Sequence, residues 1–160
     1  MATEKQTLGE KGERLVTTLC QCPRCKRTKT LRRLRANFKC ADIICDFCGY
    51  LAQVKTMSRY TEKLPDTILG AAWSVQKERI GAGLFMPLFL VQVEGRSMRI
   101  AYLAADLQEH SMFSVRKPLS QDARRAGWQG FLYVFTDDQK KRFVTLEDTG
   151  LRPRKADKAK

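Results

Sequence analysis

Four cysteines form the first group of residues in this chain whose spacing suits metal chemistry. Cys22 and Cys25 make one Cys-x2-Cys motif, and Cys45 and Cys48 make another. Each motif places two thiolates on one tight turn, and two such turns supply the four sulfur atoms that a tetrahedral Zn²⁺ accepts. The stretch between the motifs has a length usual for zinc sites. The spacing predicts a structural zinc site, with two separate redox-active motifs as the alternative.

A second group of polar residues surrounds the second cysteine pair and has the types needed for phosphodiester hydrolysis. Asp42 precedes this pair, and Gln53 and Lys55 follow it. In an antiparallel hairpin centred on the cysteines, Asp42 lies approximately opposite Gln53, and Gln53 and Lys55 share a face because side chains alternate along a strand. Asp42 and Gln53 then offer oxygen ligands to Mg²⁺, and Lys55 can orient an attacking water. Glu13 is a candidate outer ligand.

A helix and two strands must hold these polar residues in place. Thr7 and Glu10 fit a capping box at the start of the helix. Gly12 falls on the apolar side of that helix, where the missing side chain permits close approach to a sheet. Residues 38–44 and 50–57 are predicted as the strands on either side of the second cysteine pair. The alternative is that Asp42, Gln53 and Lys55 are ordinary polar side chains on an exposed face of the sheet.

The rest of the chain completes an α/β pattern. A helix is predicted over residues 66–80, and a long basic loop over residues 115–130. We expect residues 1–150 to form a single domain and residues 151–160 to form a basic, disordered tail. Strands are predicted at residues 88–93, 98–103, 131–135 and 142–146.

Composition indicates a globular protein with a polyanionic partner. The chain has 160 residues, of which 43% are hydrophobic, and a net charge of +13. Its longest apolar stretch is too short to span a membrane, and we see no signal-peptide pattern, so we expect a cytoplasmic protein with no membrane partner. In a reducing compartment paired cysteines favour metal over disulfides. Cys20 and Cys40 are expected to be ordinary small buried residues.

These motifs resemble the PD-(D/E)xK nucleases and, among them, the DpnI-type restriction endonucleases, which carry a four-cysteine zinc site in the catalytic domain. Ala41-Asp42-Ile-Ile-Cys45 and Val54-Lys55 look like that family's catalytic Asp and Lys at the same spacing. A second match is Arg116-Lys-Pro-Leu119 followed by residues 123–130. The resemblance implies a restriction-endonuclease-like PD-(D/E)xK core, which is a mixed sheet flanked by helices, with the zinc hairpin inserted.

The resemblance also implies Mg²⁺-dependent cleavage of double-stranded DNA, which DpnI-type enzymes direct to N6-methyladenine in GATC. Gln53 departs from the family's Glu, although Mrr-like nucleases of the wider superfamily have Gln-x-Lys. Exposed arginines can contact phosphates, and an aromatic side chain can wedge between bases. A solvated basic face and a core tryptophan are the alternatives. The candidate DNA-binding residues are Arg116, Lys117, Arg124, Arg125 and Trp128.

Two other functions compete with the endonuclease. One is a non-catalytic zinc-bearing DNA-binding protein, in which the amide at position 53 has ended the chemistry. The other is a basic zinc-ribbon protein of the ribosome or the transcription machinery, which explains the cysteines and the charge. That second alternative leaves the spacing between Asp42 and Lys55 without a reason, so the endonuclease is the leading hypothesis.

Overall fold

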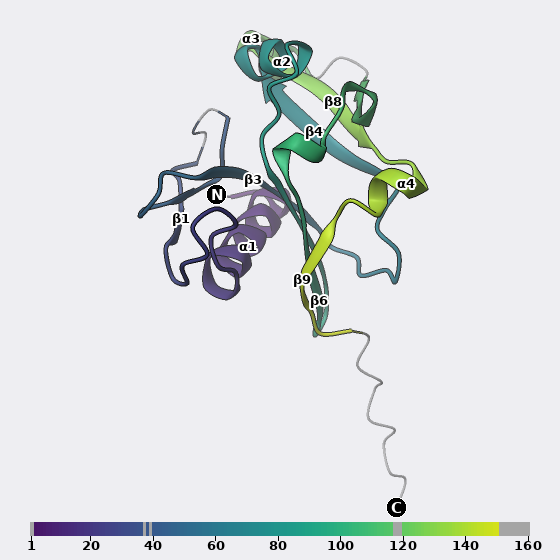
Figure 1. Cartoon of the computed structure of the whole chain (residues 1–160). Helices are drawn as coiled ribbons and strands as arrows, with labels where there is room; N and C mark the ends of the chain where they lie inside the picture. The colour runs from purple at the N-terminus through teal and green to yellow at the C-terminus, as the bar shows by residue number, and fades with distance from the viewer. Residues whose placement is uncertain (1, 37, 39, 117–119, 151–160) are drawn as a thin grey trace, which may run out of the picture.

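The computed structural model describes residues 2–36, 38, 40–116 and 120–150, and their strands form two sheets (Figure 1). The larger sheet has the order β1-β2-β3-β5-β6-β9, and only its β3–β5 pair is parallel within these ranges. Its strands are β1 (Leu31–Arg33), β2 (Ile43–Cys45), β3 (Leu51–Met57), β5 (Leu88–Glu94), β6 (Ser97–Leu103) and β9 (Val144–Asp148). The mixed α/β fold with a sheet of mixed orientation is therefore as predicted.

The smaller sheet is antiparallel and has the order β4-β8-β7. Its strands are β4 (Thr67–Trp73), β7 (Phe113–Val115) and β8 (Trp128–Val134). The helices are α1 (Glu4–Leu19), α2 (Ser74–Gly81), α3 (Gln121–Arg125) and α4 (Asp137–Lys140), with 3-10 turns η1 (Ala105–Leu107) and η2 (His110–Met112). No helix in the described ranges is long and apolar enough to cross a membrane.

Helix α1 lies against the larger sheet, and its start differs from the prediction. Thr3 is the N-cap, and Gln6 completes the capping box. The expected cap at Thr7 is wrong because the Thr7 N–H already donates to the Thr3 carbonyl within the first helical turn (3.0 Å). The expected close approach is confirmed, since a Cβ atom on Gly12 would lie 1.8 Å from the Thr56 Oγ1 on β3.

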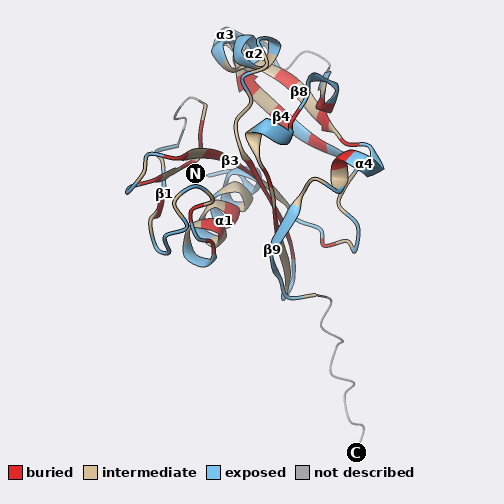
Figure 2. Ribbon diagram, viewed as in Figure 1, coloured by how far each residue is buried: buried red, intermediate tan, exposed pale blue. Residues whose placement is uncertain are grey.

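Strand β5 is buried on both faces and joins two hydrophobic clusters (Figure 2). Phe89, Val91 and Val93 pack in the cluster that contains Val16 of α1. Leu88 and Leu90 pack in a second cluster with residues of the smaller sheet. One face of the larger sheet is thus covered by a helix and the other by a sheet, whereas the family resemblance implied helices as the flanking layer.

The helix predicted over residues 66–80 is wrong in its first half. Residues Thr67–Trp73 form β4, and α2 begins only at Ser74. Ile68, Gly70 and Ala72 are the buried positions of β4, which is the alternation of a strand. Every residue of β4 pairs with β8, and this pairing partner lies far along the chain.

The remaining predictions hold to different degrees. The strands expected at 88–93 and 98–103 are present as β5 and β6, and the strand expected at 142–146 is displaced to β9. The strand expected at 38–44 contracts to β2, so Asp42 lies just before it. The loop expected at 115–130 contains α3 and the start of β8. The tail expected at 151–160 lies outside the described residues.

Candidate metal centre and nuclease-like site

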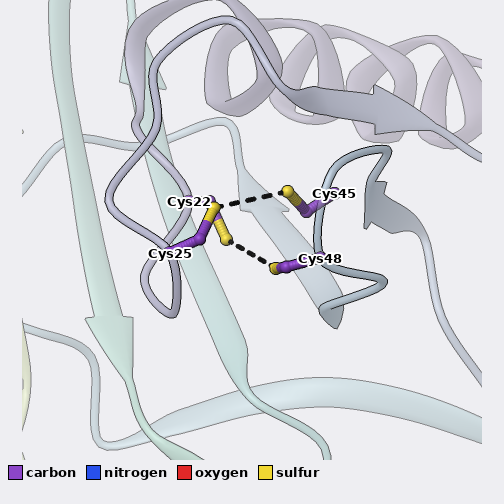
Figure 3. A group of neighbouring side chains, drawn as sticks. All are labelled: Cys22, Cys25, Cys45 and Cys48. Carbon is purple, nitrogen blue, oxygen red and sulfur yellow. Dashed lines mark hydrogen bonds between the residues drawn. The ribbon is translucent and has the colours of Figure 1, made fainter.

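The four paired cysteines come together in one cluster, with all sulfur atoms within 4.8 Å of one another (Figure 3). The Sγ atoms of Cys22 and Cys48 are 3.6 Å apart, and those of Cys25 and Cys45 are 3.7 Å apart. A tetrahedron with zinc–sulfur bonds of ~2.3 Å has edges of about 3.8 Å. The spacing of the thiols is therefore compatible with a four-coordinate zinc ion.

Each cysteine pair forms the same kind of backbone turn. The residue after the second cysteine has a positive φ in both, 61° for Lys26 and 73° for Gly49. Its N–H donates to the first cysteine's carbonyl, from Lys26 to Cys22 and from Gly49 to Cys45, each at 2.9 Å. The first cysteine's N–H in turn donates to the carbonyl two residues beyond the second cysteine. The two turns thus have the same pattern of backbone hydrogen bonds.

Side chains also join the two turns. The Arg27 guanidinium lies 3.6 Å from the centroid of the Phe47 ring, and the Arg24 guanidinium lies 5.5 Å from the centroid of Tyr50. In each contact an arginine of the first turn covers an aromatic residue of the second. Such cation–π contacts hold the turns against each other from outside the sulfur cluster.

The surroundings of the thiols differ. Burial raises the pKa of Cys22 to about 12. Burial also opposes ionisation of Cys45, but the Thr30 hydroxyl (3.3 Å) and nearby backbone N–H groups outweigh it and lower that pKa to about 6. Cys20 lies outside the cluster and is buried as expected, which raises its pKa to about 12. Cys40 is also outside the cluster, but it is only half-buried and has a φ of 81°.

The hairpin of β2 and β3 sets Asp42 opposite Gln53, as the sequence predicted. Ile43 pairs with Ala52, and the Asp42 N–H donates to the Ala52 carbonyl at 3.0 Å. The Asp42 Oδ2 also accepts a hydrogen bond from the Val54 N–H at 2.7 Å. This second bond holds the carboxylate against the backbone of β3 and leaves its other oxygen for a further partner.

The Gln53 side chain bridges two segments of the chain. Its Oε1 accepts a hydrogen bond from the Tyr133 hydroxyl at 3.0 Å, and its Nε2 donates to the Cys40 carbonyl at 3.5 Å. Tyr133 is 3% exposed. Burial raises the pKa of Tyr133, and the charge of Asp42 raises it further, so the hydroxyl keeps its proton. Tyr133 was not predicted as a site residue, and its one signal in the sequence is a hydroxyl group within the apolar strand predicted at residues 131–135.

Lys55 follows Gln53 on the same side of β3. Both side chains are half-buried. Ala52 and Val54, which alternate with them along the strand, are buried, so the predicted alternation is present. Among the residues that the structure describes, none forms a hydrogen bond or ion pair with the Lys55 ammonium. The amine is therefore available to a ligand that approaches this side of the strand.

Glu13 and Asp42 line one pocket of about 330 Å³ between α1 and the hairpin, together with Glu10 and Phe38. Burial raises the pKa of Glu13, and the charge of Asp42 adds to the shift. An ion pair with Arg33 at 3.0 Å opposes it. Gln53 and Tyr133 line a neighbouring pocket with residues of α2. The predicted carboxylates of Glu13 and Asp42 thus share one pocket, and Gln53 lines the other.

The candidate DNA-binding residues that the structure describes lie at the end of the smaller sheet where β7 ends and β8 begins. Arg116 is exposed just after β7, and Arg124 and Arg125 are exposed on α3. Trp128 begins β8 and packs against Trp73 of β4, with ring centroids 4.3 Å apart and ring planes tilted by 36°. Trp128 is half-buried, so it is partly a packing residue. Lys117 lies outside the described residues.

The comparisons with known proteins give one family. The model of the DpnI family, described as the Dam-replacing family, matches residues 3–144, which include both cysteine pairs and, apart from Ala2, all residues that line the two pockets. A search of curated proteins finds no match. The chain therefore belongs to the DpnI family, and this membership indicates a restriction-like nuclease with DNA as its substrate.

Proposed function

We propose that the protein is a metal-dependent endonuclease that hydrolyses phosphodiester bonds of double-stranded DNA at a PD-(D/E)xK site. The observation that carries this proposal is the register of the β2–β3 hairpin, which sets Asp42 opposite Gln53 with Lys55 next on the same face. Glu13 of α1 lines a pocket together with Asp42. Membership of the DpnI family supports the reaction class.

The donor atoms around Asp42 suit a hard divalent cation. The carboxylates of Asp42 and Glu13 and the amide oxygen of Gln53 are the oxygen ligands that Mg²⁺ prefers. Bound Mg²⁺ supplies Lewis acidity to a phosphoryl oxygen and lowers the pKa of a ligated water. The Val54 N–H fixes the Asp42 carboxylate at 2.7 Å, so this ligand is oriented before a metal arrives.

Lys55 takes the role of orienting the water and offsetting negative charge on the phosphorane. Its ammonium has no partner among the described residues, so it loses no existing contact when a phosphate binds. A fixed positive charge beside the reacting phosphate favours the transition state over the ground state, because the charge of the phosphorane is larger.

The structural zinc ion is assigned to the four cysteines, where it fixes the hairpin that carries Asp42 and Gln53. Exposed arginines on α3 and after β7 would contact the phosphates of the DNA duplex. We further propose N6-methyladenine in GATC-type sites as the target and restriction as the setting, on the strength of the family membership.

The test is a cleavage assay with adenine-methylated and unmethylated plasmid, in Mg²⁺, Mn²⁺ or chelator. Lys55→Ala should reduce metal-dependent cleavage by about 10²–10³-fold, the usual loss for one transition-state donor. Lys11→Ala is the matched control, because Lys11 is an exposed lysine on α1. Binding of DNA without cutting in every metal would contradict catalysis and favour the non-catalytic DNA-binding protein. Equal cutting of both plasmids would remove the methyl preference alone.

A further inference from the structure

The amide of Gln53 has a partner at each end, and one of them, the Cys40 carbonyl, allows only one orientation of the amide. The Cys40 carbonyl, 3.5 Å from Nε2, can accept a hydrogen bond but cannot donate one. The NH2 group of Gln53 must therefore face Cys40, and the amide oxygen must face the Tyr133 hydroxyl at 3.0 Å. A reversed amide would set two carbonyl oxygens against each other.

The backbone at both sides of this amide is fixed. Cys40 has a φ of 81°, which is unusual for a residue other than glycine and aims its carbonyl at Gln53. The Gln53 N–H donates to the Pro87 carbonyl at 2.8 Å, which ties β3 to the start of β5. The side chain therefore has little freedom to seek other partners.

Tyr133 is anchored as firmly as the amide that it binds. Its ring lies 5.2 Å from Phe113 and 5.0 Å from Phe131, measured between centroids, and it belongs to the cluster that includes Leu88 and Leu90. Within the described ranges, Gln53 is the side chain that accepts the hydrogen bond from the Tyr133 hydroxyl. Turning the amide away would leave a buried hydroxyl without an acceptor, which is costly.

We infer that Tyr133 is a positioning residue and that the pocket around position 53 is built for an amide. This inference rests on the proposed function, because it concerns how the amide oxygen is presented to the metal. A glutamate at position 53 satisfies Tyr133 equally well, but it sets its second oxygen against the Cys40 carbonyl. Gln53 is then a matched part of the site and not a decayed glutamate.

The first test needs no Mg²⁺ or Mn²⁺. Tyr133→Phe, Gln53→Ala and the double variant form a double-mutant cycle in urea unfolding of the zinc-loaded protein. The expected coupling is about fivefold in the unfolding equilibrium constant, the ratio that ~1 kcal/mol for one hydrogen bond gives at 1.4 kcal/mol per factor of ten. Additive effects would overturn the inference.

The second test measures Mn²⁺ affinity by electron paramagnetic resonance, in the zinc-loaded protein without DNA. Tyr133→Phe should weaken Mn²⁺ binding about fivefold because the amide oxygen is no longer held in place. Tyr60→Phe is the control, since Tyr60 is also buried and donates to a carboxylate, that of Asp148, at 2.7 Å. It should leave the Mn²⁺ affinity unchanged.

Gln53→Glu separates the inference from its opposite. An amide-specific pocket gives no gain in Mn²⁺ affinity with glutamate, despite the added charge. A gain of tenfold or more would show that the pocket prefers a carboxylate and would overturn the inference. If the unfolding cycle shows the coupling while the wild-type protein binds no Mn²⁺ and cuts no DNA, the proposed function fails and the amide pocket stands.

Discussion

Gly12 provides the sharpest test of how the first helix is seated. A Cβ atom at this position would lie 1.8 Å from Oγ1, 2.9 Å from Cβ and 3.0 Å from Cγ2 of Thr56. Rotation of Thr56 about χ1 moves Oγ1 and Cγ2 but leaves its Cβ in place. In Gly12→Ala the helix must therefore shift away from β3.

The expected magnitude follows from two opposing effects. Alanine gains about 1 kcal/mol over glycine in a helix. Overpacking costs about 1–3 kcal/mol, and the short distances at Thr56 place this case at the upper end. Gly12→Ala should lower the free energy of unfolding by about 2 kcal/mol. Gly9→Ala in the same helix meets no atom within 4 Å and should raise it by about 1 kcal/mol.

Urea unfolding of the two variants measures this difference, expected to be about 3 kcal/mol. Gly12→Ala combined with Thr56→Ala should recover part of the loss, because two of the three blocking atoms are removed. Equal stability of Gly9→Ala and Gly12→Ala would refute the close contact of α1 with β3. The shift of α1 also moves Glu13. Gly12→Ala should therefore weaken Mn²⁺ binding at the proposed site, whereas Gly9→Ala should leave it unchanged.

Two further predictions concern the metal centre and acid stability. Cys45→Ser should lose zinc and unfold the hairpin, since a structural zinc ion contributes roughly 10–16 kcal/mol of folding free energy. Cys20→Ser is the control and should keep one zinc ion per chain by metal analysis. Full zinc content in Cys45→Ser would contradict the site. Burial opposes ionisation of Asp148, but hydrogen bonds from Tyr60 and Arg99 prevail and lower its pKa. Its stabilising contribution is therefore present above about pH 4 and is lost as pH falls through the lowered value. Wild-type protein should lose more unfolding free energy between pH 5 and about pH 2.5 than Asp148→Asn, and equal losses would count against this network.

The local features of the site were predictable because they depend on residues close in sequence. Each cysteine turn is closed by hydrogen bonds within a few residues, and the second turn alone sets Asp42 against Gln53. Gly12 was recognisable because a glycine on the apolar side of a helix has few other uses.

The predictions that failed concern elements whose partners lie far along the chain. Leu69, Ala72 and Trp73 have a spacing that fits a helix as well as a strand, and only pairing with β8 decides for the strand. The hydrogen bond between Tyr133 and Gln53 could not be predicted from the sequence for the same reason, since no residue near either one indicates the other. The sequence therefore predicted the hairpin well and the smaller sheet poorly.

The distance along the chain between Gln53 and Tyr133, 80 residues, has a consequence for protein synthesis. The proposed metal ligands all precede β5 in the sequence, and a zinc ion would close their hairpin early. Yet β3 gains its parallel neighbour β5 and the partner of its Gln53 amide on β8 only after those later strands have left the ribosome. A nascent chain would thus carry the closed hairpin before Gln53 has met Tyr133, and the proposed site would be assembled only once β8 has paired.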